Sequence, residues 1–165
     1  MIAILLSEFN KKITDGLLEG CLVSLKENGY TDEQIDIHYV PGAFELPAKI
    51  KLLKKSVKKY KCIITLGCII KGETDHYHYI SQAVTNGIMS TTLDIDKNYI
   101  PIIFGVLTCQ NKELAYARSN NNLDPSQPPP RFLFRRAYRR RARCSLEPPP
   151  FLIFYNRLAM CDVPN

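Results

Sequence analysis

The chain has 165 residues, enough for one domain with a buried core, and its 45% hydrophobic content is ordinary for a soluble protein. No apolar run approaches the length of a membrane span, and no basic residues precede the apolar start at residues 2–6, as they would in a signal peptide. The six cysteines form no Cys-x-x-Cys pair, so we expect reduced thiols in a cytoplasmic protein, and neither disulfides nor a metal site.

The net charge of +6 is concentrated at one end of the chain. Residues 1–119 carry thirteen lysines and one arginine against thirteen acidic residues, whereas residues 120–165 carry eight arginines and no lysine against three acidic residues. The basic character therefore belongs to the tail, and we do not expect the body of the protein to bind nucleic acid.

The first part of the chain alternates predicted strands and helices. Residues 2–6 are an uninterrupted apolar run, typical of a strand that is covered on both faces. Asn10 is placed to cap a helix, because apolar residues recur at helical spacing over 13–25 and Asn28-Gly29 follows as a stop signal. Residues 35–40 are predicted to form a second strand.

The alternation continues to residue 119. The remaining predicted elements are a helix at 43–56, a buried strand at 62–66, a helix at 76–92, a strand at 102–107 and a short helix at 110–119. Pro47 is compatible with its helix only in the first turn, where a missing N–H group costs nothing. Strands that alternate with helices imply a parallel sheet, so we predict an α/β fold with three layers.

The polar turn between the third predicted strand and its helix is the best candidate for a functional site. It contains Gly72, Glu73, Thr74 and His76, at the kind of strand-to-helix turn where parallel sheets bind ligands. Unpaired N–H groups at a helix start attract anions, and a histidine can transfer protons near neutral pH. The alternative is an ordinary capped turn whose histidine makes only local hydrogen bonds.

Two aromatic residues and one arginine complete the candidate constellation. Phe9 and Phe44 follow the first and second strands, where each ring could stack on a flat heterocycle or pack against another subunit. Arg118 could clamp a phosphate or simply lie in solvent at a helix end. These residue types indicate either a cofactor-free enzyme acting on a small phosphorylated substrate or a protein that binds a flavin-like molecule. We assign no functional role to His38 or His78.

Four stretches carry a resemblance to a known family. They are Ser7-Glu8-Phe9-Asn10, residues 40–47 (VPGAFELP), residues 66–77 (LGCIIKGETDHY) and residues 104–108 (FGVLT). In this order they resemble lumazine synthase (6,7-dimethyl-8-ribityllumazine synthase) of riboflavin biosynthesis, over about residues 1–119. The resemblance implies a flavodoxin-like three-layer α/β/α sandwich with a four-stranded parallel sheet.

The resemblance also implies an activity. The expected reaction condenses 5-amino-6-(D-ribitylamino)uracil with 3,4-dihydroxy-2-butanone 4-phosphate to 6,7-dimethyl-8-ribityllumazine and releases phosphate and water, without metal or organic cofactor. His76 and Arg118 would be catalytic. The substrate-binding residues would be Phe9, Asn10, Ala43, Phe44, Glu45, Cys68, Ile69, Ile70, Gly72, Glu73, Thr74 and Phe104. Phe104 would come from an adjacent subunit, so we expect a homo-oligomer, either a pentamer or a 60-subunit shell, with riboflavin synthase as a possible partner.

Two departures leave other functions open. Lys71 and His78 replace the family's usual arginine and acidic residue, and residues 120–165 form a Pro/Arg-rich tail that does not match the family. We expect this tail to be irregular or partly helical, and either non-native (joined from another source or reading frame) or disordered. The alternatives are an inactive homologue that binds flavin or lumazine, and a protein that binds polyanions through the basic tail.

Overall fold

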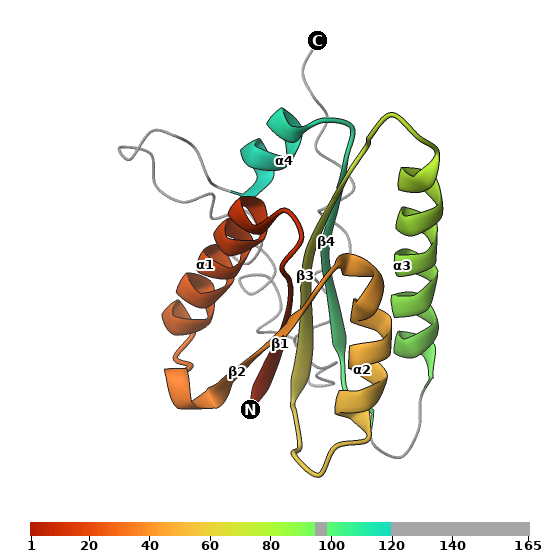
Figure 1. The fold of residues 1–165 in the computed structure, drawn as a ribbon. Coiled ribbons are helices and arrows are strands. Elements are labelled where there is room, and N and C mark those ends of the chain that lie inside the picture. Colours follow the sequence, from red (N-terminus) through yellow and green to blue (C-terminus); the bar gives the residue numbers. More distant parts are fainter. Residues whose placement is uncertain (95–98, 120–165) are drawn as a thin grey trace, which may run out of the picture.

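The computed structural model describes residues 1–94 and 99–119, so the predictions for the tail lie outside the described residues. A four-stranded parallel sheet with strand order β2-β1-β3-β4 lies between two layers of helices (Figure 1). The elements are β1 (Ile2–Ser7), α1 (Lys11–Glu27), η1 (Asp32–Gln34), β2 (Ile35–Val40), η2 (Ala43–Glu45), α2 (Leu46–Lys54), β3 (Cys62–Ile70), α3 (His76–Leu93), β4 (Ile102–Cys109) and α4 (Lys112–Ser119). This confirms the predicted flavodoxin-like α/β/α sandwich. None of the described helices is long and apolar enough to cross a membrane.

The inner strand β1 lies between two apolar cores. Ile2, Ile4 and Leu6 pack in the core that includes α1 and α4, whereas Ala3 and Leu5 pack in the core that includes α2 and α3. All six residues of β1 are buried because both faces of the sheet are covered. The uninterrupted apolar run at the start of the chain was therefore interpreted correctly.

Strand β3 is longer than the sequence indicated. The prediction that it ends at Leu66 is wrong, since the ladder with β4 continues from Gly67, opposite Val106, to Ile70, opposite Cys109. Gly67 does not form a turn. A Cβ atom at this position would lie 3.3 Å from Cβ of Ala43, so the glycine lets η2 pack directly on the strand.

The helix after β2 begins with a tighter turn than expected. Residues 43–45 form the 3-10 helix η2, and the α-helix begins at Leu46 and ends at Lys54, shorter than the predicted range of 43–56. Pro47 lies in the first turn of α2, as predicted, where its ring replaces an N–H group that would have no partner in the helix.

Candidate functional site

The carboxyl ends of the four strands bring most of the candidate residues to one edge of the sheet. Phe9 follows β1, η2 follows β2, and the 71–75 turn follows β3. Helices α3 and α4 both begin at this edge, and Figure 1 shows them on opposite sides of the sheet, at the top of the view. The predicted clustering is therefore present, and it includes residues from both helical layers.

Asn10 connects the start of α1 to β3. The prediction that its side chain caps the helix is wrong: Asn10 occupies the N-cap position, but its side chain makes no capping hydrogen bond. Its backbone is in the left-handed region, with φ of 61°, which asparagine tolerates better than most residues. The side-chain amide Nδ2 instead donates to the carbonyl oxygen of Cys68 at 3.0 Å.

Backbone hydrogen bonds connect the remaining turns of this edge. The N–H group of Phe9 donates to the carbonyl of Pro41 at 3.0 Å, which joins the ends of β1 and β2. The N–H group of Lys71 donates to the carbonyl of Cys109 at 2.9 Å, which joins the ends of β3 and β4. Together with the Asn10 bond, these contacts link all four strand ends, so the turns have defined positions relative to one another.

The η2 turn separates an anchoring residue from two exposed ones. Ala43 is 6% exposed and packs against β3 at Gly67. Phe44 is 56% exposed, and Glu45 is also exposed. Because the buried Ala43 fixes the turn, the Phe44 ring and the Glu45 carboxylate are held on the surface of the edge.

The start of α3 is open to solvent. Gly72, Glu73, Thr74 and His76 are all exposed. Asp75 is the N-cap residue of α3, and no side chain caps this end by a hydrogen bond. The N–H group of His78 donates to the Asp75 carbonyl at 3.0 Å. Those of His76 and Tyr77 have no acceptor among the described residues, so they are available to an anion beside the Thr74 hydroxyl and the His76 ring.

The end of β3 offers backbone groups. The Cys68 side chain is 1% exposed, and its burial raises the pKa of the thiol to about 12. A thiol with such a high pKa is not a nucleophile at neutral pH. Ile69 is buried and Ile70 is half-buried, so a ligand at this strand end would meet mainly main-chain N–H and C=O groups.

Arg118 and Phe104 do not join the other candidates within one chain. The Arg118 guanidinium donates through Nη1 to the carbonyl of Leu114 at 3.1 Å, within its own helix α4. Phe104 lies opposite Thr65, well before the end of β4, and packs half-buried against the core of the α2 and α3 layer. Arg118 lies near the end of α4, on the opposite side of the sheet from α3 and His76.

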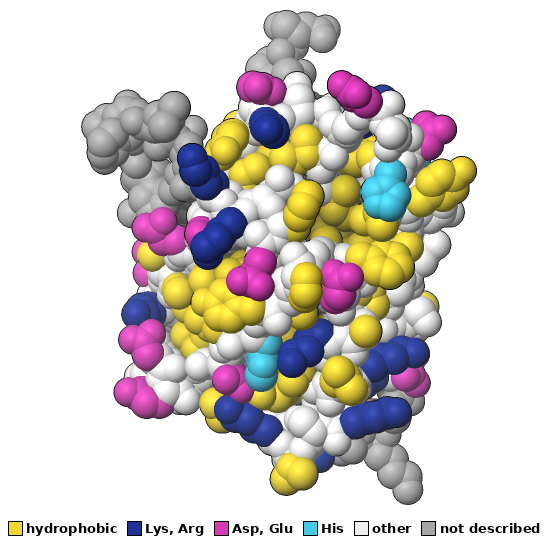
Figure 2. All heavy atoms as spheres, in the orientation of Figure 1, with side chains coloured by type: hydrophobic (Ala, Val, Ile, Leu, Met, Phe, Trp, Pro, Cys, Tyr) yellow, Lys and Arg dark blue, Asp and Glu magenta, His cyan; other side chains and the backbone are white. Residues whose placement is uncertain are grey.

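One aromatic residue at this edge was not singled out from the sequence. Tyr39, near the end of β2, is 54% exposed, so Phe9, Tyr39 and Phe44 form a set of exposed rings around the ends of β1 and β2. The alternation Ile35, Ile37, Tyr39 could have indicated that its ring lies on the α1 side of the edge strand. Figure 2, in the orientation of Figure 1, shows hydrophobic side chains exposed at many places on this side of the molecule, with a histidine over the upper part of α3.

Fold and edge together define a class of protein: a flavodoxin-like α/β protein whose candidate ligand-binding edge lies at the carboxyl ends of its strands. The family model of 6,7-dimethyl-8-ribityllumazine synthase matches residues 1–126. Three curated relatives from Coxiella burnetii strains CbuG_Q212, RSA 493 / Nine Mile phase I and Dugway 5J108-111 are each named 6,7-dimethyl-8-ribityllumazine synthase. Each is 46% identical over 118 residues, which is 72% of this chain and 76% of the relative. The chain belongs to the 6,7-dimethyl-8-ribityllumazine synthase family.

Proposed function

We propose that this protein is an enzyme of riboflavin biosynthesis that makes 6,7-dimethyl-8-ribityllumazine from 5-amino-6-(D-ribitylamino)uracil and 3,4-dihydroxy-2-butanone 4-phosphate. The observation that carries the proposal is the composition of the carboxyl edge. All four stretches of the family pattern are present, and an uncapped helix start with Thr74 and His76 lies at the same edge as exposed aromatic rings.

The start of α3 is the proposed phosphate site. Main-chain N–H groups at Gly72, Glu73 and Thr74, with the Thr74 hydroxyl, would bind the phosphate of the butanone, and the helix dipole favours negative charge there. Arg118 would add a planar fork of donors after leaving the Leu114 carbonyl. The same groups would stabilise the phosphate as it departs.

The other half of the edge is the proposed pyrimidine site. Phe9 would stack on the ring of the aminouracil, because its side chain is 69% exposed. Ala43, Phe44 and Glu45 would hold the ribityl chain. The backbone of residues 68–70 would bind the polar edge of the ring. Asn10 would act on the same strand end, through its bond to the Cys68 carbonyl.

His76 is the proposed proton-transfer residue. The reaction forms an imine between the amine and the ketone, eliminates phosphate and closes a second ring, and each step moves a proton. An exposed imidazole beside the phosphate site can take and return these protons near neutral pH. The protein need not supply a nucleophile, since holding both reactants together can provide much of the rate.

Completion of the site by a neighbouring subunit is part of the proposal. Phe9 and Phe44 are 69% and 56% exposed, which leaves a substrate on this edge open to water. A homo-oligomer, either a pentamer or a 60-subunit shell, would cover the edge and bring Phe104 of one subunit to the site of another. We propose a cytoplasmic location, consistent with four buried cysteines that are free. Riboflavin synthase, which would use the product, is a candidate partner.

The test is product formation from the two substrates, followed by lumazine fluorescence, with the full chain and with His76→Ala. We expect turnover by the full chain and slow turnover by the variant. Tight binding of lumazine with no turnover would instead identify an inactive binding homologue. The absence of both turnover and binding would overturn the proposal.

A further inference from the structure

The edge of the sheet opposite the candidate site carries a concentrated positive charge. Seven of the thirteen lysines of residues 1–119 lie in residues 49–61, and no acidic residue lies between Glu45 and Glu73. These residues, which we call the lysine segment, cover most of α2 and the loop that leads to β3. The charge is local, because the rest of residues 1–119 carries six lysines and one arginine against thirteen acidic residues and is therefore net negative.

Two of these lysines have partners inside the protein. Lys54 is 9% exposed and donates through Nζ to the carbonyls of Asp94 at 2.6 Å and Thr91 at 3.4 Å, at the end of α3. Lys58 donates to the Asp36 carboxylate at 2.7 Å. Among the described residues, Lys51, Lys55, Lys59 and Lys61 form no ion pair, and all four are exposed.

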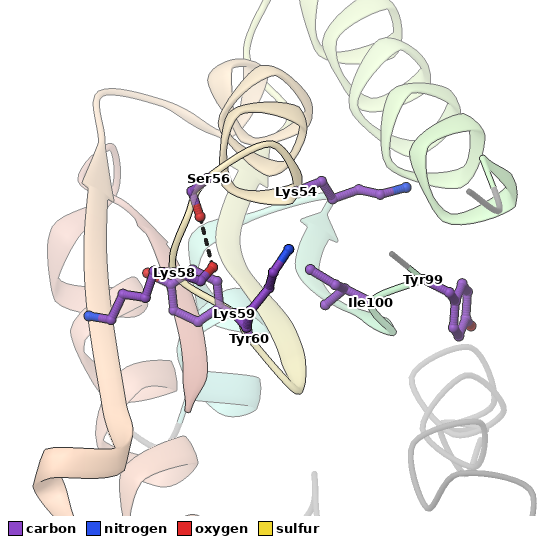
Figure 3. Close-up of a pocket in the computed structure, with 7 residues that line it drawn as sticks. All are labelled: Lys54, Ser56, Lys58, Lys59, Tyr60, Tyr99 and Ile100. Atoms are coloured by element: carbon purple, nitrogen blue, oxygen red, sulfur yellow. Dashed lines mark hydrogen bonds between the residues drawn. The ribbon is translucent and has the colours of Figure 1, made fainter. Parts of the chain in front are cut away.

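Apolar surface lies between the unpaired cations. Val57 is 96% exposed and Leu52 is 65% exposed. A cavity of about 150 Å³ adjoins the loop and is lined by Lys54, Ser56, Lys58, Lys59, Tyr60, Tyr99 and Ile100. Figure 3 shows the Lys59 ammonium directed between Lys54 and Ile100, whereas Lys58 extends away in the opposite direction. The surface therefore combines unpaired ammonium groups, an exposed aliphatic loop and an aromatic-lined hollow.

We propose that the lysine segment is a docking surface for an acidic peptide segment of a partner protein, with apolar side chains between its carboxylates. The carboxylates pair with Lys55, Lys59 and Lys61, and an apolar side chain enters the cavity beside Ile100. The unpaired lysines favour a ligand with negative charge. The exposed Val57 favours a ligand that also carries apolar groups.

The residue types favour a peptide over the other polyanions. Single-stranded nucleic acid is bound best by several exposed rings and arginine planes along a track. Here the unpaired cations are all lysines beside the exposed Val57, and Tyr60 of the cavity is only 7% exposed. A protein surface that binds a lipid bilayer is typically convex and apolar, whereas the surface of the lysine segment is hollowed at the cavity. The lysine segment is also separate from the carboxyl edge, so docking there would leave the proposed reaction site open.

The first experiment is carbodiimide crosslinking of the full chain to a synthetic peptide in which glutamates alternate with leucines. The reagent joins a peptide carboxylate to a lysine amine with loss of water, and residues 120–165 contain no lysine, so the basic tail cannot react through side chains. We expect mass spectrometry to find the crosslinks mainly on Lys55, Lys59 and Lys61. Crosslinks spread evenly over the lysines of residues 1–119 would overturn the proposal.

The second experiment compares peptide affinity by fluorescence anisotropy at several salt concentrations. We expect the triple variant Lys55→Gln/Lys59→Gln/Lys61→Gln to lose roughly tenfold in affinity, since each exposed charge pair contributes modestly. The matched control, Lys11→Gln/Lys26→Gln/Lys112→Gln, removes the same charge elsewhere and should bind as the unmodified chain does. Equal losses in both variants would refute the surface. Two further outcomes would refute the apolar acidic peptide as the ligand. One is that a polyglutamate of the same length binds as tightly as the glutamate–leucine peptide. The other is that the triple variant loses as much affinity for RNA, or for phosphatidylserine vesicles, as it loses for the peptide.

Discussion

Helices α2 and α3 approach each other closely at Gly87, and this contact supports a quantitative prediction. A Cβ atom placed on Gly87 of α3 would lie 2.8 Å from Cγ and 3.0 Å from Cβ of Pro47. The proline ring is rigid and lies in the first turn of α2, so it cannot rotate away as a flexible side chain would. The substitution Gly87→Ala therefore forces the two helices apart.

Two opposing effects set the size of the change. Alanine is favoured over glycine in a helix interior by about 0.5–1 kcal/mol. Overpacking of a tight contact typically costs about 1–3 kcal/mol. We expect the clash to dominate, so that the free energy of unfolding of Gly87→Ala falls by roughly 1–2 kcal/mol. In a chain of this size, each kcal/mol lowers the melting temperature by roughly 2–4 °C.

Gly20 of α1 provides the matched control. No atom lies within 4 Å of a Cβ placed there, so Gly20→Ala gains helix propensity without a clash. We expect it to raise the free energy of unfolding by about 0.5–1 kcal/mol. Urea unfolding followed by circular dichroism, at one protein concentration for all three proteins, measures both changes. Equal stabilisation of Gly87→Ala and Gly20→Ala would refute the predicted clash with Pro47.

Three further predictions concern protons and thiols. We expect His76→Ala to lower kcat, because it removes the proposed proton-transfer group. Its stability to urea should change little, because the His76 side chain is exposed. A kcat equal to that of the unmodified chain would remove the proposed role. Hydrogen bonds from Lys58 and Tyr60 lower the pKa of Asp36 from 3.8 to about 2, so its contribution to stability is present above pH 4 and is lost as the pH falls towards 2. Asp36→Asn should therefore be less stable than the unmodified chain at pH 7 by about 1 kcal/mol, and urea unfolding should show this difference closing between pH 4 and 2; a constant difference would contradict it. Burial raises the pKa of Cys21, Cys62 and Cys68 to about 12. Iodoacetamide at pH 8 should therefore label these thiols only after unfolding, and peptide mass spectrometry would show this. Rapid labelling of the folded protein would contradict the burial.

Local patterns in the sequence predicted the order and type of the elements. The apolar run at residues 2–6 is typical of a strand covered on both faces, and the structure buries β1 completely. Pro47 fixed the position of the first helical turn of α2, because a proline further along would break the helix. The Asn28-Gly29 stop was also informative, since Gly29 adopts the left-handed conformation with φ of 83°.

Contacts between distant segments were not predictable in the same way. Asn10 has the local signal of a helix cap, and the apolar run that predicted β3 ends just before Gly67, yet neither pattern indicated the residue's role. The Asn10 amide is bonded to the carbonyl of Cys68, and Gly67 allows the close approach of Ala43. In each case the partner lies far away in the sequence. The local sequence allows several roles for each residue, and contacts in the folded protein determine which one it has.

The two edges of the sheet differ for a reason that follows from its parallel topology. Helices α1, α2 and α3 each follow a strand and run back along it, so their amino ends lie at the carboxyl edge and their carboxyl ends at the opposite edge. The partial positive charges of helix starts favour an anion at the proposed phosphate site, and the partial negative charges of helix ends favour lysines. Lys54 fits this account, because it donates to the last carbonyls of α3. Lys55, Lys59 and Lys61 have no such acceptor among the described residues. The helix dipoles therefore explain why lysines are tolerated at this edge, and they leave unexplained why so many of them are unpaired around an exposed valine.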